Sequence, residues 1–252
     1  MFLKVGGNWL DTGTYTKGTE TVTFDGTTGT QDVTSTGSSF HNVHLDGLGA
    51  AVTFIDSAVI SNGLTVDAAD YAVTFSGAIN TIAGDTNFLN TGTTTIGDES
   101  TDSSTFTGGL VATTGTVNIA GTVATTNTAM TLGATTVSDD STINPASGEG
   151  SLAAVTINDA KTLIVTTGST GAISFGSTIN SAVGGAGNLT INTDGTATFS
   201  GNVGGTTTAI GTLNLTAGNV SPGEIIISIR AGTIAVNGGT SGLIIPDPNA
   251  LW

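Results

Sequence analysis

Short runs of alternating apolar and polar residues, joined by polar turns, constrain this chain more than any other feature. The segment "LTINTDGTATFSG" (residues 189–201) alternates around Leu189 and Ile191, turns at Asp194 and Gly195, and alternates again before it ends. A period of two residues is typical of a β-strand with one buried face. Asp, Asn and Gly tolerate the backbone angles of tight turns. We therefore expect a chain built from short strands.

The same phrase recurs at irregular intervals. Copies are "LDGLGAAVTF" (45–54), "LTVDAADYAVTFSG" (64–77), "TIGDESTDSSTFTG" (95–108) and "LIVTTGSTGAISFG" (163–176). In each copy a strand leads through a turn to a phenylalanine, and the alternation continues without phenylalanine in "TVNIAG", "MTLGATTV" and "AVTIND". The phenylalanines of this pattern are Phe24, Phe54, Phe75, Phe106, Phe175 and Phe199.

A unit of roughly 20 to 30 residues cannot bury a core alone, so neighbouring units must stack. We predict an all-β fold, a right-handed parallel β-helix (β-solenoid) of about ten turns, because parallel crossovers are right-handed. Tandem immunoglobulin-like β-sandwiches are the alternative, although the unit is short for a seven-strand domain.

The alternation also predicts which side chains point into the solenoid. Phenylalanines at equivalent corners should stack into an aromatic ladder. The expected inward residues are Leu64, Val66, Val73, Phe75, Val117, Ile119, Val155, Ile157, Leu189, Ile191, Phe199, Leu213 and Leu215.

Charge is scarce and strongly one-sided in this chain. Charged residues make up 9% of the sequence, and 4 basic against 19 acidic residues leave a formal net charge of -15. Such a charge repels phosphate backbones and anionic lipid head groups, so we expect no nucleic-acid partner and no membrane insertion. There is no cysteine, which excludes disulfides and thiolate chemistry. No stretch reaches the length of a membrane span.

Two long stretches carry a resemblance to a known class. "LTINTDGTATFSGNVGGTTTAIGTLNLTAGNV" (189–220) and "GNWLDTGTYTKGTETVTFDGTTGTQDVTSTGSSFHNVHLDG" (7–47) resemble repeats of β-strand-repeat bacterial surface proteins, of the filamentous haemagglutinin and autotransporter-passenger kind. The resemblance implies an extracellular or cell-surface adhesin shaft, spacer or filament subunit. The implied partners are another copy of the chain or surface glycans. No secretion domain of those families is visible, so an export route has no support.

The ends of a stack leave unpaired backbone groups that invite another chain. We assign residues 1–245 to a single solenoid, with 1–50 as a divergent N-terminal repeat or cap and 51–245 as repeats. Residues 246–252 form a cap, linker or docking tail, because Pro246 and Pro248 cannot donate to a ladder. Interface candidates are Phe2, Trp9, Ile244, Ile245, Leu251 and Trp252.

Metal sites have weak support in the sequence. His41 and His44 are three residues apart on an expected strand, which should place them on opposite faces. Oxygen-rich turns can bind Ca²⁺. The candidate calcium ligands are Asp98, Glu99, Asp102, Asp139 and Asp140. No calcium-loop spacing accompanies them, so solubilising turns are the simpler interpretation and no cofactor is expected.

We expect no enzyme activity. Paired acids occur in polysaccharide-acting β-helices, but the basic residues Lys4, Lys17, Lys161 and Arg230 are scattered singly. Pairs of threonines two residues apart, such as Thr105/Thr107 and Thr196/Thr198, share a strand face and are typical of ice-binding solenoids when they stack. These pairs have no constant period, so solvated strand faces explain them more simply.

Overall fold

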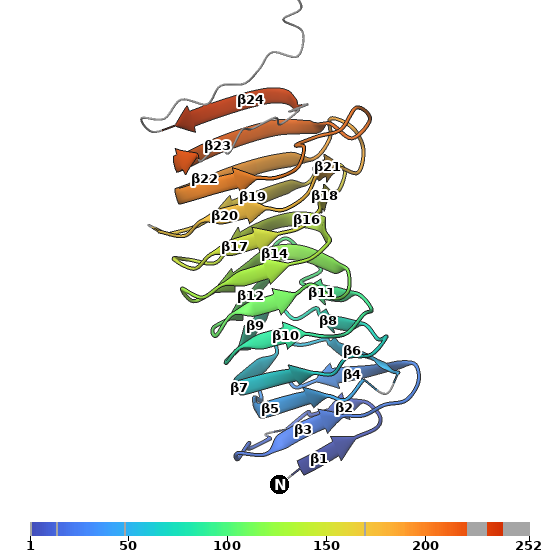
Figure 1. The fold of residues 1–252 in the computed structure, drawn as a ribbon. Coiled ribbons are helices and arrows are strands. Elements are labelled where there is room, and N and C mark those ends of the chain that lie inside the picture. Colours follow the sequence, from blue (N-terminus) through green and yellow to red (C-terminus); the bar gives the residue numbers. More distant parts are fainter. Residues whose placement is uncertain (1, 14, 48, 169, 221–230, 239–252) are drawn as a thin grey trace, which may run out of the picture.

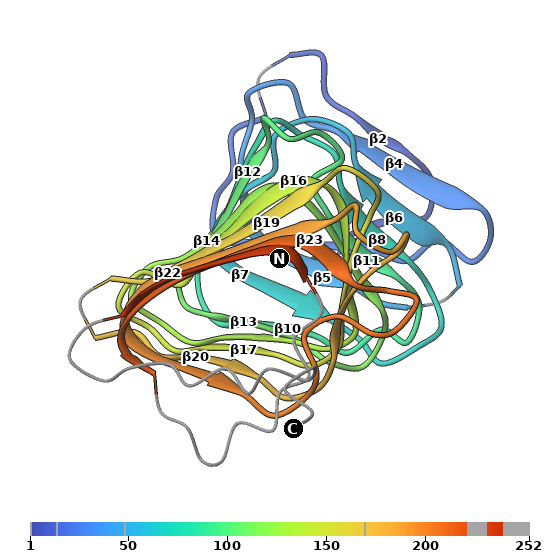
Figure 2. The ribbon, with the colours of Figure 1, turned by 90° about the horizontal axis from the view of Figure 1, so that it is seen from above.

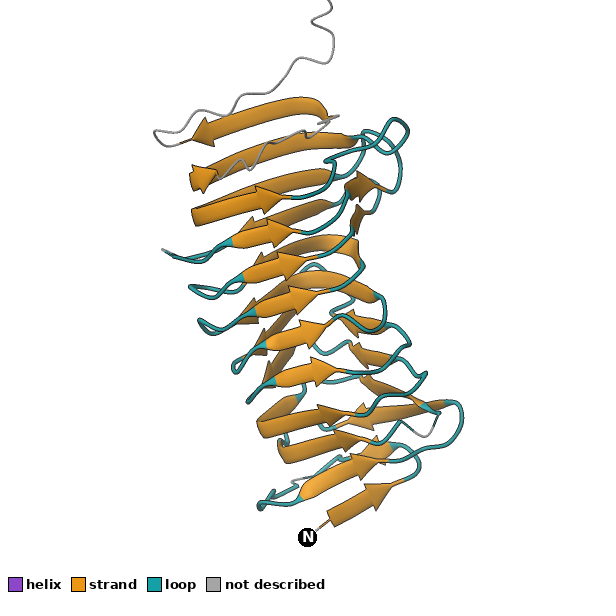
Figure 3. Cartoon of the chain, viewed as in Figure 1, coloured by secondary structure: helices purple, strands orange, loops and turns teal. Residues whose placement is uncertain are grey.

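The computed structural model is an all-β, right-handed parallel solenoid of about ten coils (Figure 1). It describes residues 2–220 and 231–238 apart from 14, 48 and 169, and side chains up to residue 216. No helix occurs among these residues (Figure 3). Of the alternatives left open by the sequence, the solenoid is confirmed and the tandem sandwiches are wrong. At roughly 4.8 Å per coil, the stack is about 50 Å long.

Three strand faces, which we name A, B and C, give the solenoid a three-sided cross-section (Figure 2). Seen from the C-terminal end, the chain runs from A to B to C counter-clockwise as it approaches the viewer, which makes the coil right-handed.

In each coil the chain passes through face A first. It contains β1 (Phe2–Val5), β3 (Thr21–Phe24), most of β5 (Phe40–Leu45), the second half of β7 (Val59–Val66), β10 (Thr86–Phe88), β13 (Leu110–Ala112), β15 (Met130–Leu132), β17 (Gly150–Leu152), β20 (Ile173–Phe175) and the end of β22 (Asn188–Phe199).

Face B follows face A. It contains β2 (Trp9–Leu10), β4 (Thr30–Thr34), β6 (Ala51–Phe54), β8 (Val73–Phe75), β11 (Thr94–Ile96), the first parts of β14 (Val117–Thr125) and β16 (Thr135–Asn144), β18 (Val155–Ile157) and β21 (Ile179–Ser181).

Face C closes each coil. It contains the first residues of β5 and β7, β9 (Ile79–Ile82), β12 (Ser103–Phe106), the second parts of β14 and β16, β19 (Thr162–Thr166), the first part of β22, most of β23 (Ile210–Val220) and β24 (Ala231–Gly238). The last residues of β23 continue onto face A.

All pairings between these strands are parallel and join a strand to its equivalent in the next coil. Equivalent positions on face A are 19 to 24 residues apart, from Val5 and Phe24 at the short extreme to Phe175 and Phe199 at the long one. Pairing continues through residue 50, because β4 pairs with β6. The expected tail 246–252 lies outside the described residues.

The core is a continuous column of inward side chains. Twelve of the thirteen residues predicted to point inward are buried, and Phe199 is partly buried against the core. Because Leu, Ile, Val and Phe fill the column from Val22 to Leu215, each coil buries its apolar face only against its neighbours.

Phenylalanines at equivalent positions do stack, but as two separate pairs rather than as one ladder, because the phenylalanines of the pattern occupy different faces. Phe54 and Phe75 are equivalent on face B and stack with ring centroids 4.8 Å apart, and Phe175 and Phe199 stack on face A at 5.2 Å. Phe106 is on face C and meets Phe75 edge-on at 6.3 Å. The strand–turn–phenylalanine phrase therefore spans any two neighbouring faces rather than one coil.

Candidate functional site

The corner between faces B and C gathers the acidic residues that the sequence singled out. One corner loop (residues 97–102) carries Asp98, Glu99 and Asp102, and a second, shorter one, the bulged bend of β16 at 138–140, carries Asp139 and Asp140. The two loops belong to the fifth and seventh coils, which flank the coil containing β14. The structure thus brings two separate sequence clusters to one corner, which sequence reasoning did not foresee.

Asp102 organises the first loop. It is 5% exposed, and its Oδ2 accepts hydrogen bonds from the backbone N–H groups of Asp98 and Glu99, both at 3.0 Å. Burial, and then the hydrogen bond to Asp102, raise the pKa of Asp98 above its usual value. The first loop therefore uses the Asp102 carboxylate to hold its own backbone.

The second loop is tied to the next coil by a cation. Lys161 Nζ donates to Asp139 Oδ1 at 2.6 Å, and this hydrogen bond lowers the pKa of Asp139 and raises that of Lys161. The charge of Glu99 also raises the pKa of Lys161. The sequence shows only that the basic residues are scattered singly. The fold places Lys161 beside an acidic cluster, which could not be foreseen because the register between coils could not be read from the sequence.

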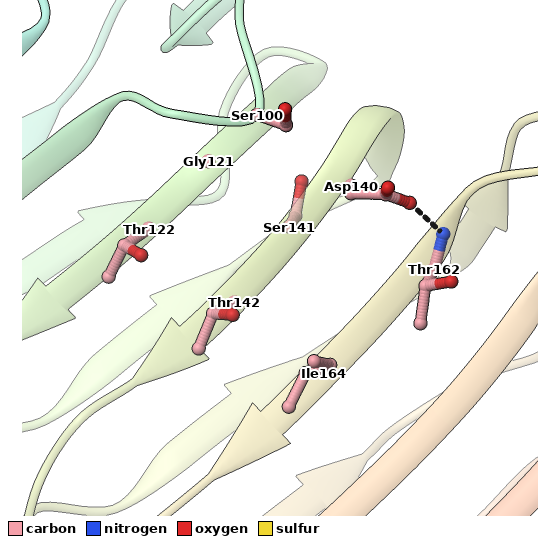
Figure 4. Close-up of a pocket in the computed structure, with 8 residues that line it drawn as sticks. All are labelled: Ser100, Gly121, Thr122, Asp140, Ser141, Thr142, Thr162 and Ile164. Carbon is pink, nitrogen blue, oxygen red and sulfur yellow. Dashed lines mark hydrogen bonds between the residues drawn. The ribbon is translucent and has the colours of Figure 1, made fainter.

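A hollow, which we name the corner notch, lies beside these loops and extends over the neighbouring strands β14, β16 and β19 (Figure 4). Its volume is about 290 Å³. It is lined by Ser100, Gly121, Thr122, Asp140, Ser141, Thr142, Thr162 and Ile164. Asp140 Oδ1 accepts a hydrogen bond from the Thr162 backbone N–H at 2.7 Å, which fixes the carboxylate at the rim.

The notch exists because the coil beneath it has no corner loop. β14 passes from face B to face C through Gly121, whose φ is +68°. A Cβ at Gly121 would lie 2.3 Å from the Asp102 carbonyl oxygen, so only glycine allows this close approach. The loops of the flanking coils project past this tight corner and leave a gap.

A second acidic stack follows face A in the N-terminal coils. Asp25, Asp46 and Asp67 occupy equivalent positions directly after β3, β5 and β7. Lys4 Nζ lies 3.3 Å from Asp25 Oδ2 and 3.5 Å from Asp46 Oδ2, and His44 Nε2 lies 3.0 Å from Asp67 Oδ2. We name this group the aspartate ladder.

The structure does not assemble a metal site from the candidate ligands. Among the described residues, no three His, Cys, Asp or Glu side chains are placed to hold an ion. The prediction for the histidines is wrong, because a bulge between Phe40 and Asn42 breaks the alternation. His41 and His44 are both partly exposed, while Phe40 and Val43 are both buried.

The N-terminal interface candidates have two different environments. Phe2 is 80% exposed, whereas Trp9 packs edge-on against Tyr15 and Phe40 at 5.2 and 5.4 Å. Burial and the hydrogen bond to Glu20 raise the pKa of Tyr15 to about 12. The other candidates, Ile244, Ile245, Leu251 and Trp252, lie outside the described residues.

Face B carries an ordered row of outward polar side chains that sequence analysis missed. Its members occupy the same position in successive coils and are partly exposed. They are Asp32, Thr53, Thr74, Thr95, Asn118, Thr136, Thr156 and Asn180. The threonine pairs noted in the sequence come from other faces and corners, so their irregular spacing concealed this row.

The chain matches no protein-family model, no curated protein sequence and no solved structure. The resemblance to bacterial surface repeats therefore stays a prediction. No helix long and apolar enough to cross a membrane occurs in the described part of the chain.

Proposed function

We propose that this chain is a structural segment of a secreted or cell-surface protein, serving as an adhesin shaft, a spacer or a filament subunit. The observation that supports this role best is the uninterrupted parallel ladder over a continuous core, from β1 to β23. Each strand inside the stack bonds to the coil before it and the coil after it, so a pull along the axis acts on many hydrogen bonds in parallel. The role needs no catalytic residue.

The side-chain composition of the surface also fits an extracellular rod. Of the three described basic residues, Lys4 and Lys161 are paired with aspartates and only Lys17 has no ion pair in the described structure, so the surface is acidic and rich in Thr, Ser and Asn. Such a surface repels anionic polymers and stays hydrated. We place the protein outside the cell as part of this proposal.

Electron microscopy and light scattering of the purified chain, with and without EDTA, test the structural role. We expect uniform rods whose length and melting temperature do not depend on EDTA, because the core and ladder supply the stability. Rods joined end to end would identify a filament subunit, and separate rods a spacer. Loss of the rod form in EDTA would instead support a calcium-stabilised module.

The row on face B favours ice binding as a second candidate function. Thr53, Thr74 and Thr95 repeat on successive coils roughly 4.8 Å apart, and such a regular hydroxyl array orders water. Thermal hysteresis of a dilute solution checks this directly. A Thr74→Lys variant should lower the hysteresis, and a freezing point equal to the melting point in the unaltered protein would exclude the function.

A further inference from the structure

The corner notch combines hydroxyl groups, one carboxylate and one aliphatic side chain in its lining. Hydroxyls of Thr122 and Thr142 stand side by side on neighbouring strands, with Ile164 at the same position on the next strand (Figure 4). Asp140 stands at the end of this row, on the corner. One wall thus offers hydrogen-bonding groups, and Ile164, 38% exposed, offers an aliphatic contact.

The chemistry of the lining excludes most ligand classes. A metal ion is unsuitable because Asp140 is the only carboxylate in the lining. An anion is unsuitable because no cation lines the notch, and the neighbouring Lys161 already donates to Asp139 and lies in the field of Glu99. A purely apolar ligand would find Ile164 as its only large apolar neighbour. A neutral ligand with several hydroxyls and a C–H face matches the wall.

We propose that the corner notch binds one neutral sugar unit of a glycan. The volume of about 290 Å³ is at the small end of ligand pockets, about 300 to 1,000 Å³, which suits a single ring rather than a long chain. The open side of the notch leaves room for the rest of the glycan to continue into solvent.

Asp140 is the main positioning group in this site. Its Oδ1 is held by the Thr162 N–H, which leaves Oδ2 to accept a hydrogen bond from a sugar hydroxyl. The hydroxyls of Thr122 and Thr142 can donate or accept and so adapt to neighbouring sugar hydroxyls. Ile164 packs against the C–H face of the ring. The site goes beyond the structural role and does not depend on it.

Saturation-transfer NMR on the whole chain tests the proposal. The probes are maltose, lactose and cellobiose at millimolar concentration, with glucuronic acid as the anionic control. We expect saturation transfer to at least one neutral sugar and none to glucuronic acid, because the surrounding carboxylates repel it. Weak affinity is expected, since one ring makes few contacts.

Two matched pairs of variants locate the binding. Thr142→Phe fills the notch, whereas Thr190→Phe places the same ring in the same outward row of face C two coils further on. We expect at least a five-fold loss of saturation transfer in the first and no loss in the second. Asp140→Asn keeps an oxygen for the Thr162 N–H and should weaken binding several-fold, while Asp159→Asn, one coil further, should not.

Melting temperatures show whether each variant is folded. Equal saturation transfer in Thr142→Phe and Thr190→Phe, both folded, would overturn the proposal, and so would equal transfer to glucuronic acid and the neutral sugars. Absence of transfer to every neutral probe would overturn it as well. None of these results bears on the rod form, so the structural role is tested separately.

Discussion

The aspartate ladder and the corner notch both stack acidic residues at a corner of the solenoid, but with opposite results. In the ladder, Asp25, Asp46 and Asp67 come from three successive coils, and Lys4 and His44 lie against them. The acidic residues around the notch come from two coils that flank the coil of β14, and the coil of β14 has no loop at this corner. The ladder therefore forms a continuous stripe, whereas the notch corner has a gap.

This difference teaches that the number of residues at a corner, which shifts the register between β14 and β16 there, shapes the surface of the molecule. Both regions have the same parallel pairing and the same kind of core. Only the number of residues at the corner differs, and insertions there are tolerated because they lie outside the ladder. A solenoid can thus gain a binding hollow by shortening a single corner.

The first way to test the comparison is to weaken the core that the two regions share. Phe75 is fully buried between them and contacts Phe54, Phe88 and Phe106. We expect Phe75→Ala to cost about 3 to 5 kcal/mol of unfolding free energy, because it leaves a cavity in a packed column. Hydrogen exchange should show weaker protection at both Asp46 and Thr122, and protection lost at only one of them would mean that the regions unfold independently.

Alanine substitutions at two glycines should have a smaller effect on stability and should separate backbone strain from steric conflict. Gly121 and Gly29 both have positive φ, but a Cβ at Gly29 meets nothing within 4 Å. We expect Gly29→Ala to cost about 1 kcal/mol from the backbone alone. Gly121→Ala should cost about 3 kcal/mol, because the new Cβ also collides with Asp102. Denaturant titration measures the loss of unfolding free energy in each variant. Equal losses would mean that the close approach of residue 121 to Asp102 is not needed for stability.

Removing the cation of the ladder should have a modest, salt-dependent effect. Lys4→Met keeps the aliphatic stem and leaves Asp25 and Asp46 without their shared partner. We expect a lower melting temperature at low ionic strength and almost no change at 1 M salt, where the Debye length is about 3 Å. Lys17→Met is the control because Lys17 has no ion pair in the described structure. A decrease in melting temperature that is the same at low and high salt would indicate lost packing instead.

The smallest effect concerns Asp98, whose pKa is raised in the folded state by burial and by Asp102. A raised folded pKa favours the protonated form, so ionisation of Asp98 costs stability as pH rises above the unfolded value of 3.8. Asp98→Asn should therefore raise the melting temperature slightly at pH 7 and leave it unchanged well below pH 3.8. A stabilisation that persists in acid would contradict this explanation.

Much of the fold could be predicted because the strand signal is local. Leu189 and Ile191, or Val155 and Ile157, are buried as their alternation requires. The positions of the phenylalanines could not be assigned in the same way, since the phrase that ends on Phe75 runs from face A to B, and the one that ends on Phe199 from C to A. A local phrase that fits every corner does not reveal which face it occupies.

The candidate site was less predictable for the same reason. Asp98 and Asp140 are 42 residues apart in the sequence, yet they meet at one corner because the intervening coils are stacked. Thr122, Thr142 and Ile164 carry no motif, and only pairing of β14, β16 and β19 aligns them. A signal was present in "NIAGT", where strand residues surround a lone glycine without the polar residues of a turn.

The sequence by itself determined that this chain forms stacked parallel β-strands with an apolar interior and an acidic, hydroxyl-rich surface. These properties follow from residue type and from a period of two, which act within a few residues. The tertiary structure decided which coils align, where Lys161 meets Asp139, and where a short corner opens the notch. Equivalent positions on successive coils are 19 to 24 residues apart on face A and up to 26 on face C, so these contacts depend on the closure of each coil against the last.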